Sequence, residues 1–150
     1  MKQPQERTKR LEKMSLVCEA LFKMRNFQSS RAIVSAIVSI HLEMLKKNQQ
    51  ITISSSVLNI LKPIKEIYEK NAMEYRKLIL NSISENIPLI PFIGIHLSDL
   101  IYINEAPNFV KDKNLINFLK FKQLKDQIFI INKLQELKYS SKYTSSKILR

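Results

Sequence analysis

Hydrophobic residues recur every three or four positions along most of the chain, which is the spacing of amphipathic α-helices. The first helix is predicted over residues 6–24, with an apolar stripe made of Leu11, Met14, Val17 or Cys18, Leu21 and Met24. Further helices are predicted at about residues 29–47, 54–67 and 73–80. Ser29 or Ser30 can cap the second helix, and Pro63 is expected to kink the third or to mark its true start. Alternation at residues 51–53 is a weak strand signal.

The segment Pro88–Glu105 breaks this pattern and contains the single glycine of the chain, Gly94. Pro88 and Pro91 each fix their own φ and move the preceding residue out of the helical region, so an extended, apolar elbow is expected ahead of the glycine. Helical spacing then resumes and predicts a short helix over Ile95–Ala106.

A long helix is predicted from Leu115 to Leu137, and its apolar face is expected to consist of Phe118, Phe121, Leu124, Ile128, Ile131 and Leu134. At 1.5 Å per residue this helix would be roughly 35 Å long. Because Pro107 stops the short helix, the short and long helices are expected to form a hairpin. Residues 138–150 are rich in serine and lysine and are predicted to be a flexible basic tail. The prediction is therefore one all-α domain over residues 1–137.

The composition is that of one globular domain. The chain has 150 residues, of which 45% are hydrophobic, and no apolar run approaches the roughly 20 residues that a membrane-spanning helix needs. The first residues carry no secretory signal, and the single cysteine, Cys18, cannot form an internal disulfide, so a cytoplasmic location is expected. The net charge of +12 would attract nucleic acid, an acidic leaflet or an acidic protein, but evenly spread lysines equally well solvate helix faces.

Several kinds of chemistry are excluded by what the chain lacks. A phosphate-binding loop needs several glycines, so one glycine cannot form a P-loop or a dinucleotide-binding turn. His41, His96 and Cys18 do not show the clustered spacing of a metal site, and neither metal nor cofactor is expected. Both histidines are expected to be ordinary helix residues. Cys18 lies in an apolar stretch, where a buried and inert thiol is the expectation.

Four sequence blocks follow one another: residues 26–35 (Asn-Phe-Gln-Ser-Ser-Arg-Ala-Ile-Val-Ser), Tyr75-Arg76, residues 88–100 with Ile-Pro-Phe-Ile-Gly, and Glu105 followed by Asn117-Phe118-Leu119-Lys120. In this order and spacing they resemble the catalytic domain of exchange factors for Ras-family GTPases, the Cdc25 homology domain. The resemblance runs over about residues 7–137 and corresponds to the C-terminal part of that domain, so the opening helices of the domain are expected to be missing. Ala36 and Ala106-Pro107 depart from the family pattern, which usually has glycine there.

The resemblance implies an irregular helical bundle, shaped as a bowl, from which the hairpin protrudes and opens the nucleotide site of a small GTPase. Ile101 would push an apolar side chain toward the magnesium site, and Glu105 would offer a carboxylate to the P-loop groups that had held phosphate. These two residues stand four apart and so share one face of the short helix. The resemblance implies that Asn26 and Phe92 touch the GTPase or hold the hairpin. It implies that Leu97, Asn117 and Lys120 bind the GTPase.

The predicted function is guanine-nucleotide exchange on a Ras-, Rap- or Ral-type GTPase, without covalent chemistry. Recruitment to a membrane through the GTPase is expected, as is a second polypeptide or self-association that covers the faces left by the missing helices. The alternative is an inactive GTPase-binding or scaffold module of the same fold. A nucleic-acid binder would rest on net charge alone, so no nucleic-acid partner is expected. Ile101 also fits a core position, Phe92 a hinge wedge and Asn26 a turn or cap residue.

Overall fold

The computed structural model describes residues 4–46, 54–69, 72–110 and 115–139. In these residues the chain forms six α-helices and one two-stranded antiparallel ladder, so the all-α prediction is confirmed. The elements in chain order are α1 (Pro4–Lys23), α2 (Phe27–Lys46), α3 (Ser55–Glu69), α4 (Ala72–Ser84), α5 (Ile93–Glu105), β1 (Phe109–Val110), β2 (Leu115–Ile116) and α6 (Phe118–Glu136). Among the described helices, none combines the length and the apolar character that crossing a membrane requires.

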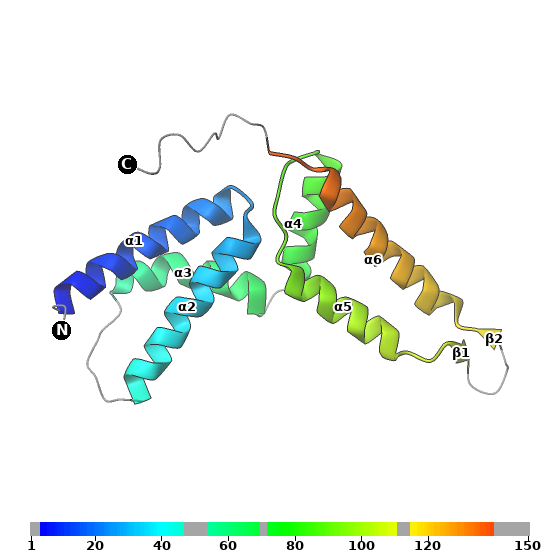
Figure 1. Ribbon diagram of the computed structural model, residues 1–150, viewed down its shortest axis with the longest axis horizontal. Helices are drawn as coiled ribbons and strands as arrows, with labels where there is room; N and C mark the ends of the chain where they lie inside the picture. The colour runs from blue at the N-terminus through cyan, green and yellow to red at the C-terminus, as the bar shows by residue number, and fades with distance from the viewer. Residues whose placement is uncertain (1–3, 47–53, 70–71, 111–114, 140–150) are drawn as a thin grey trace.

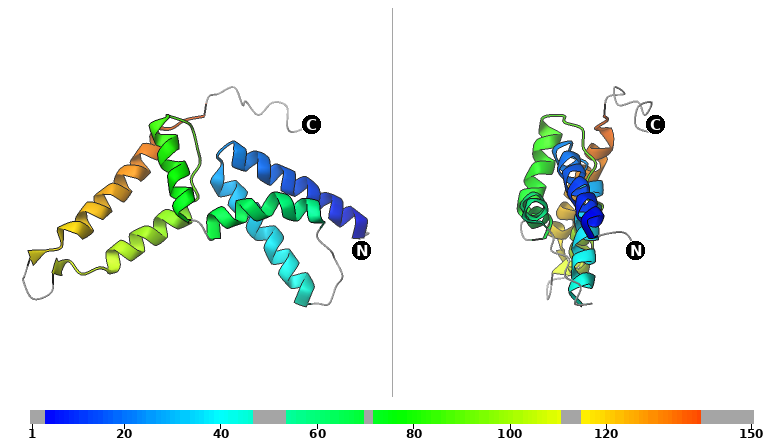
Figure 2. Two further views of the ribbon diagram at one scale, coloured as in Figure 1. Left: turned by 180° about the vertical axis from the view of Figure 1, so that it is seen from behind. Right: turned by 90° about the vertical axis from the view of Figure 1, so that its left-hand side faces the viewer.

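The helices form two groups with α4 between them (Figure 1). α1, α2 and α3 pack on one another, whereas α5 and α6 run out from α4 as a hairpin that ends in the β1–β2 ladder. The two views in Figure 2 show that both groups lie in nearly one plane, with the hairpin extending away from α1–α3. The predicted helical hairpin is therefore present, and it protrudes from the rest of the chain.

The core lies where α1–α3 meet α4, the segment after α4 and the end of α6. It is one cluster of buried residues: Leu11, Cys18, Phe27, Val34, Ile37, Val57, Leu61, Ile64, Tyr68, Tyr75, Ile79, Leu89 and Leu134. The rings of Phe22 and Tyr75 each meet the Phe27 ring edge-on, at centroid distances of 5.4 and 5.5 Å. Such pairs stabilise by about 0.5–1.5 kcal/mol beyond the burial of their area. These rings fix α4 on α1–α3 and so determine where the hairpin begins.

The predicted apolar stripe of α1 is only partly correct. Leu11 and Cys18 are buried, but the buried position between them is Ser15. The predicted stripe residues that are exposed are Met14, Val17 and Met24. The reason is that α2 and α3 cover the Ser15 side of the helix, where the serine hydroxyl donates to a backbone carbonyl at 2.8 Å and needs no water. Burial raises the pKa of the Cys18 thiol, as expected for an inert cysteine.

Two details of the helix boundaries differ from the prediction. Asn26, and neither Ser29 nor Ser30, caps α2, because its Oδ1 accepts a hydrogen bond from Ser29 N at 3.1 Å. The interpretation of Asn26 as a cap residue is therefore confirmed. α3 runs through Pro63, which is exposed and does not mark the start of the helix. The carbonyl that loses its donor to this proline belongs to exposed Asn59, where water can satisfy it.

The hairpin differs from the prediction at the start of α5 and at its far end, where α6 begins. α5 begins at Ile93, ahead of the glycine, and α6 begins at Phe118, three residues after Leu115. Leu115 and Ile116 form β2 instead, and Phe109 of β1 pairs with Ile116. The ladder forms because α5 stops at Glu105 and the chain must reverse before α6 can start.

The predicted apolar face of α6 is only partly correct. Leu134 is buried as predicted, and Leu124 and Ile131 are half-buried. Phe118, Phe121 and Ile128 are 77%, 43% and 48% exposed, and the other buried position of α6 is Lys120, which the predicted face did not include. Helical spacing shows two neighbouring apolar stripes on this helix, and the packing of α5 decides which one is covered. The strand signal at residues 51–53, the side chain of His41 and residues 140–150 of the predicted tail lie outside the described residues.

Candidate functional site

The elbow, residues 87–92, joins α4 to α5 and is bound to the start of α2. Ile90 N donates to Arg25 O at 3.0 Å, and Phe27 N donates to Ile90 O at 2.9 Å. These two bonds form a parallel bridge between Ile90 and Asn26. The predicted extended elbow is therefore confirmed, and α2 fixes the point from which α5 departs.

Tyr75 of α4 holds the last residue of the elbow. Its hydroxyl accepts a hydrogen bond from Phe92 N at 2.7 Å and donates to Phe92 O at 3.4 Å. Burial raises the pKa of the Tyr75 hydroxyl, which is fully enclosed. The Phe92 ring packs edge-on against Tyr68 at 5.8 Å and leaves so little space that a Cβ at Gly94 would lie 2.6 Å from Phe92 Cζ. A glycine is needed here for space, since its φ is not positive.

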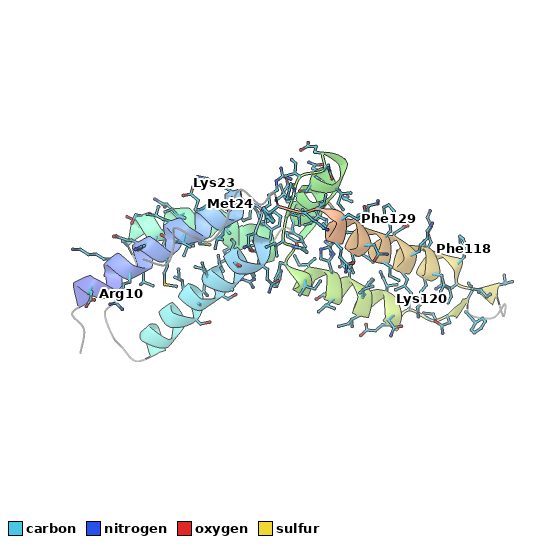
Figure 3. All side chains as sticks on the ribbon, turned by 45° about the horizontal axis from the view of Figure 1, so that its top comes forward. Arg10, Lys23, Met24, Phe118, Lys120 and Phe129 are labelled. Atoms are coloured by element: carbon cyan, nitrogen blue, oxygen red, sulfur yellow. The ribbon has the colours of Figure 1, made fainter. Side chains whose placement is uncertain are left out.

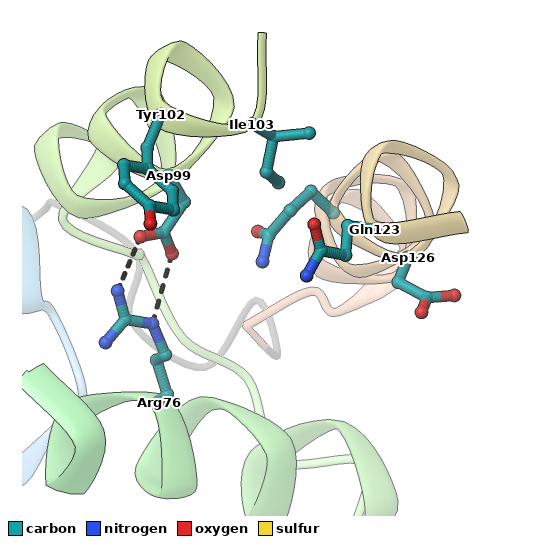
Figure 4. Close-up of a pocket in the computed structure, with 7 residues that line it drawn as sticks. Arg76, Asp99, Tyr102, Ile103, Gln123 and Asp126 are labelled. Carbon is teal, nitrogen blue, oxygen red and sulfur yellow. Dashed lines mark hydrogen bonds and ion pairs between the residues drawn. The ribbon is translucent and has the colours of Figure 1, made fainter. Parts of the chain in front are cut away.

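Arg76, the next residue of α4, binds α5 directly (Figure 4). Its Nε donates to Asp99 Oδ2 at 3.1 Å and its Nη2 donates to Asp99 Oδ1 at 2.5 Å, which makes a bidentate ion pair. The Asp99 side chain is 19% exposed and that of Arg76 is 42% exposed. Beside this pair lies an open hollow of about 310 Å³ between α5 and α6, lined also by Tyr102 and Gln123.

His96 lies on the same side of α5 as Asp99 and is buried. It borders a cavity of about 210 Å³ whose wall includes Ile79, and its ring lies 6.1 Å from the Tyr75 ring. Neither ring nitrogen has a hydrogen-bond partner among the described residues. Burial lowers the pKa of His96, and the Asp99 carboxylate offsets this only in part, so the imidazole is neutral at pH 7.

The far end of α5 is held by Lys120 of α6, which lies between the two helices (Figure 3). Its Nζ donates to three oxygens: Asn104 O at 2.9 Å, Ala106 O at 2.6 Å and Asn108 Oδ1 at 2.7 Å. The cation thus satisfies carbonyls at the negative end of the α5 dipole. Asn117 caps α6 by accepting from Lys120 N at 3.3 Å, and its Nδ2 donates to Pro107 O at 3.0 Å. These contacts close the hairpin.

The outward stripe of α5 consists of Leu97, Ile101 and Glu105. Leu97 and Ile101 are 51% and 62% exposed, and Glu105, the last residue of the helix, is exposed as well. With 3.6 residues per turn, these positions lie on the side of α5 opposite Asp99, which faces α4. The interpretation of Ile101 as a core residue is therefore wrong.

The other candidate residues, of which Lys120 is buried and the rest are half-buried, make contacts inside the molecule and do not belong to the outward stripe. Asn26 and Phe92 belong to the contacts that hold the elbow, and Asn117 and Lys120 to those that close the hairpin. Within the described ranges, no three His, Cys, Asp or Glu side chains lie close enough together to hold a metal ion. The arrangement is a helix held by hydrogen bonds at its start, middle and end, whose outward side exposes apolar and acidic side chains.

Comparison with known proteins identifies the family to which this arrangement belongs. The family model described as the RasGEF domain matches residues 1–122 of the chain. The chain belongs to the RasGEF domain family. The matched range includes the elbow, α5 and the start of α6, so all the candidate residues lie inside it.

Relatives of this RasGEF chain include proteins named for guanine-nucleotide exchange or dissociation. The chain is 34% identical over 118 residues to "Ras guanine nucleotide exchange factor K" of Dictyostelium discoideum, covering 77% of the chain and 7% of that protein. It is 32% identical over 118 residues to "Cell division control protein 25" of Saccharomyces cerevisiae, covering 76% and 7%. It is 28% identical over 148 residues to "Ral guanine nucleotide dissociation stimulator-like 3" of Mus musculus, covering 87% and 21%. The chain thus spans less than a quarter of the length of each of these relatives.

Sequence reasoning missed the side chains that orient the RasGEF hairpin. Tyr75, Arg76 and Asp99 all belong to the blocks that carried the family resemblance, but no role was attached to them. Tyr75 and Arg76 reach partners 17 and 23 residues further along the chain, and helical spacing cannot reveal such contacts. The available signal was a cation, Arg76, before the elbow and a carboxylate, Asp99, after it.

Proposed function

We propose that this RasGEF domain promotes the release of GDP from a Ras-family small GTPase, and that the residues of its outward stripe act on the nucleotide site. The observation that carries the proposal is an exposed Ile101 beside an exposed Glu105 on a protruding hairpin. An isoleucine that is 62% exposed adds little to a core, and a carboxylate in the last turn opposes the helix dipole. Neither placement favours stability, which supports a role toward a partner.

In the proposed mechanism, Ile101 and Glu105 act on two parts of the nucleotide site. Bound GDP is held by Mg²⁺ and by amides and a lysine around its phosphates. Ile101 approaches the metal and removes favourable ligation, while Glu105 accepts hydrogen bonds from the donors that the phosphates leave. The nucleotide-free GTPase is stabilised, and no covalent bond is made or broken. Because coupling between two ligands is reciprocal, rebinding of a nucleotide displaces the domain.

The proposed partner is a GTPase of the Ras, Rap or Ral type, because the relatives are named for Ras and for Ral. Membrane recruitment through this GTPase is part of the same proposal. Met14, Leu16 and Val17 of α1 are 38%, 56% and 45% exposed, which supports the expectation of a second polypeptide or a second copy over this face.

The proposal is tested by the release of a fluorescent GDP analogue from a GTPase that the wild-type chain accelerates. Glu105→Lys places a cation among donors that need an anion, so we expect the acceleration to fall at least about 100-fold. Glu136→Lys is the matched control, because Glu136 also ends a hairpin helix and its side chain is 64% exposed, but it lies on α6.

Equal acceleration by the wild type and by Glu105→Lys would contradict the mechanism. Tight binding of a GTPase with an unchanged nucleotide off-rate would favour the alternative, a scaffold that uses the same face without exchange. Circular dichroism of each variant, compared with the wild type, shows that a lost activity does not reflect unfolding.

A further inference from the structure

Among the described residues, four side chains tie α5 to the rest of the chain, and two of them are consecutive residues of α4. At the start of the helix Tyr75 binds Phe92, and Gln28 accepts a hydrogen bond from Ile93 N at 3.2 Å. Arg76 binds Asp99 in the middle of the helix, and Lys120 binds carbonyls at its end. The ties at the two ends hold backbone atoms near the helix axis. The middle tie holds a side chain away from the axis, so it alone of the four resists rotation of α5 about that axis.

The packing between α4 and α5 is interrupted around the Arg76–Asp99 pair. An open hollow of about 310 Å³ and a cavity of about 210 Å³ both border the pair, and both residues line both spaces. Figure 4 shows the two side chains meeting across the space between the helices. Close apolar packing therefore does not set the separation here, and the fixed geometry of a bidentate pair does.

Asp99 and the outward stripe lie on opposite sides of α5. At 3.6 residues per turn, Leu97, Ile101 and Glu105 stand about 160°, 200° and 240° around the helix from Asp99. Ile103, on the Asp99 side, is buried. When Asp99 is held toward α4, the outward stripe is turned away from α4.

The geometry points to Arg76 and Asp99 as positioning residues, which set the rotation and tilt of α5 and thereby aim the outward stripe at its partner. Both residues act through the helix, since their charged groups are bonded to each other. A misplacement of about 1 Å at a reacting group can lower a rate about 100-fold, so a loosened α5 lowers exchange. The effect on the rate rests on the proposed function, whereas the effect on helix position does not.

Helix position is measured by pulsed EPR between two spin labels on the whole chain. Cysteines replace exposed Ala20 on α1 and exposed Leu119 on α6, in a Cys18→Ser background. The wild-type pair is expected to give one narrow distance distribution. Asp99→Asn and Arg76→Gln each leave one charge without its partner, and we expect both to broaden or shift the distribution.

The controls separate positioning from a general loss of charge. Glu136→Gln breaks the exposed Lys133–Glu136 pair within α6, which bridges no two helices, and should leave the distribution unchanged. The double variant Arg76→Asp with Asp99→Arg restores opposite charges across the gap and should recover a narrow distribution. Asp99→Glu keeps the charge on a longer side chain, so a shifted distance is expected from it even where a neutral variant does not fold.

The rate is measured with the same variants over a range of domain concentrations, which separates the maximum release rate from the half-saturating concentration. We expect Asp99→Asn to lower the maximum rate about tenfold and to change the half-saturating concentration by less than about twofold. Unchanged distances in both Asp99→Asn and Arg76→Gln would overturn the positioning role. Changed distances with an unchanged maximum rate would overturn its link to the outward stripe. If the wild type accelerates no GTPase, the proposed function fails, and the distances still decide the positioning role.

Discussion

Replacing Tyr75 by phenylalanine removes one buried hydroxyl and tests how the elbow is held. The hydroxyl accepts from Phe92 N at 2.7 Å and donates to Phe92 O at 3.4 Å. Leaving a buried donor unsatisfied costs about 1–3 kcal/mol, and Phe92 is only half-buried, so water recovers part of the loss. We therefore expect the free energy of unfolding to fall by about 1.5 kcal/mol. In a chain of this size, that lowers the Tm by about 3–6 °C.

The free energy of unfolding is measured by urea denaturation followed by far-UV circular dichroism. Tyr102→Phe is the matched control, because Tyr102 is 76% exposed and the loss of its hydroxyl should change the stability by less than about 0.5 kcal/mol. A Tyr75→Phe variant that is as stable as the Tyr102→Phe variant would refute the reasoning.

The same variant has a distinct pH dependence. Burial raises the pKa of Tyr75 above the unfolded value of about 10, so the folded state holds the phenolic proton more tightly than the unfolded state. The stability from this neutral phenol is complete below about pH 10 and is lost as the pH rises further. The wild type should therefore lose more stability above that pH than Tyr75→Phe, and equal losses would show that the phenol is not enclosed.

Three further changes test the packing around α5 and α6. Gly94→Ala should destabilise the chain by about 1–3 kcal/mol in urea denaturation, because the new Cβ would meet Phe92 Cζ at 2.6 Å, and any gain in stability would contradict this. The lowered pKa of His96 predicts that the stability from its neutral form is complete above about pH 6.5 and is lost as the pH falls below that value. The urea midpoint should therefore change less between pH 7 and 5 in His96→Leu than in the wild type. Lys120→Met leaves three oxygens without their donor and should cost about 2–4 kcal/mol, whereas exposed Lys122→Met should change the Tm little.

The sequence predicted the elements that form the hairpin because their signals are local. The prolines of the elbow restrict their own neighbourhood, and helical spacing after Gly94 marks α5 to within two residues at its start and one at its end. The placing of Ile101 and Glu105 on one face follows from their separation of four residues alone. Both are exposed in the structure, and the family resemblance singled out the same two.

What the sequence could not show depends on contacts between distant segments. The apolar spacing of α1 does not reveal that Ser15, with its hydroxyl satisfied by the helix backbone, is buried while Met14 is not. Lys120 was expected at a GTPase contact, yet its ammonium group is enclosed by oxygens 12 to 16 residues earlier in the chain. The spacing of apolar residues cannot show that the acceptors for a lysine come from the end of another helix.

The central claim is that this domain accelerates nucleotide release, and stopped-flow release of a fluorescent GDP analogue tests it most directly. The folded wild-type chain is mixed with loaded Ras, Rap and Ral GTPases in excess unlabelled nucleotide, and Ile101→Ser is measured beside it. The account predicts faster release from at least one of these GTPases with the wild type, and a much smaller effect with Ile101→Ser. A folded wild-type chain that leaves every release rate unchanged would contradict the account.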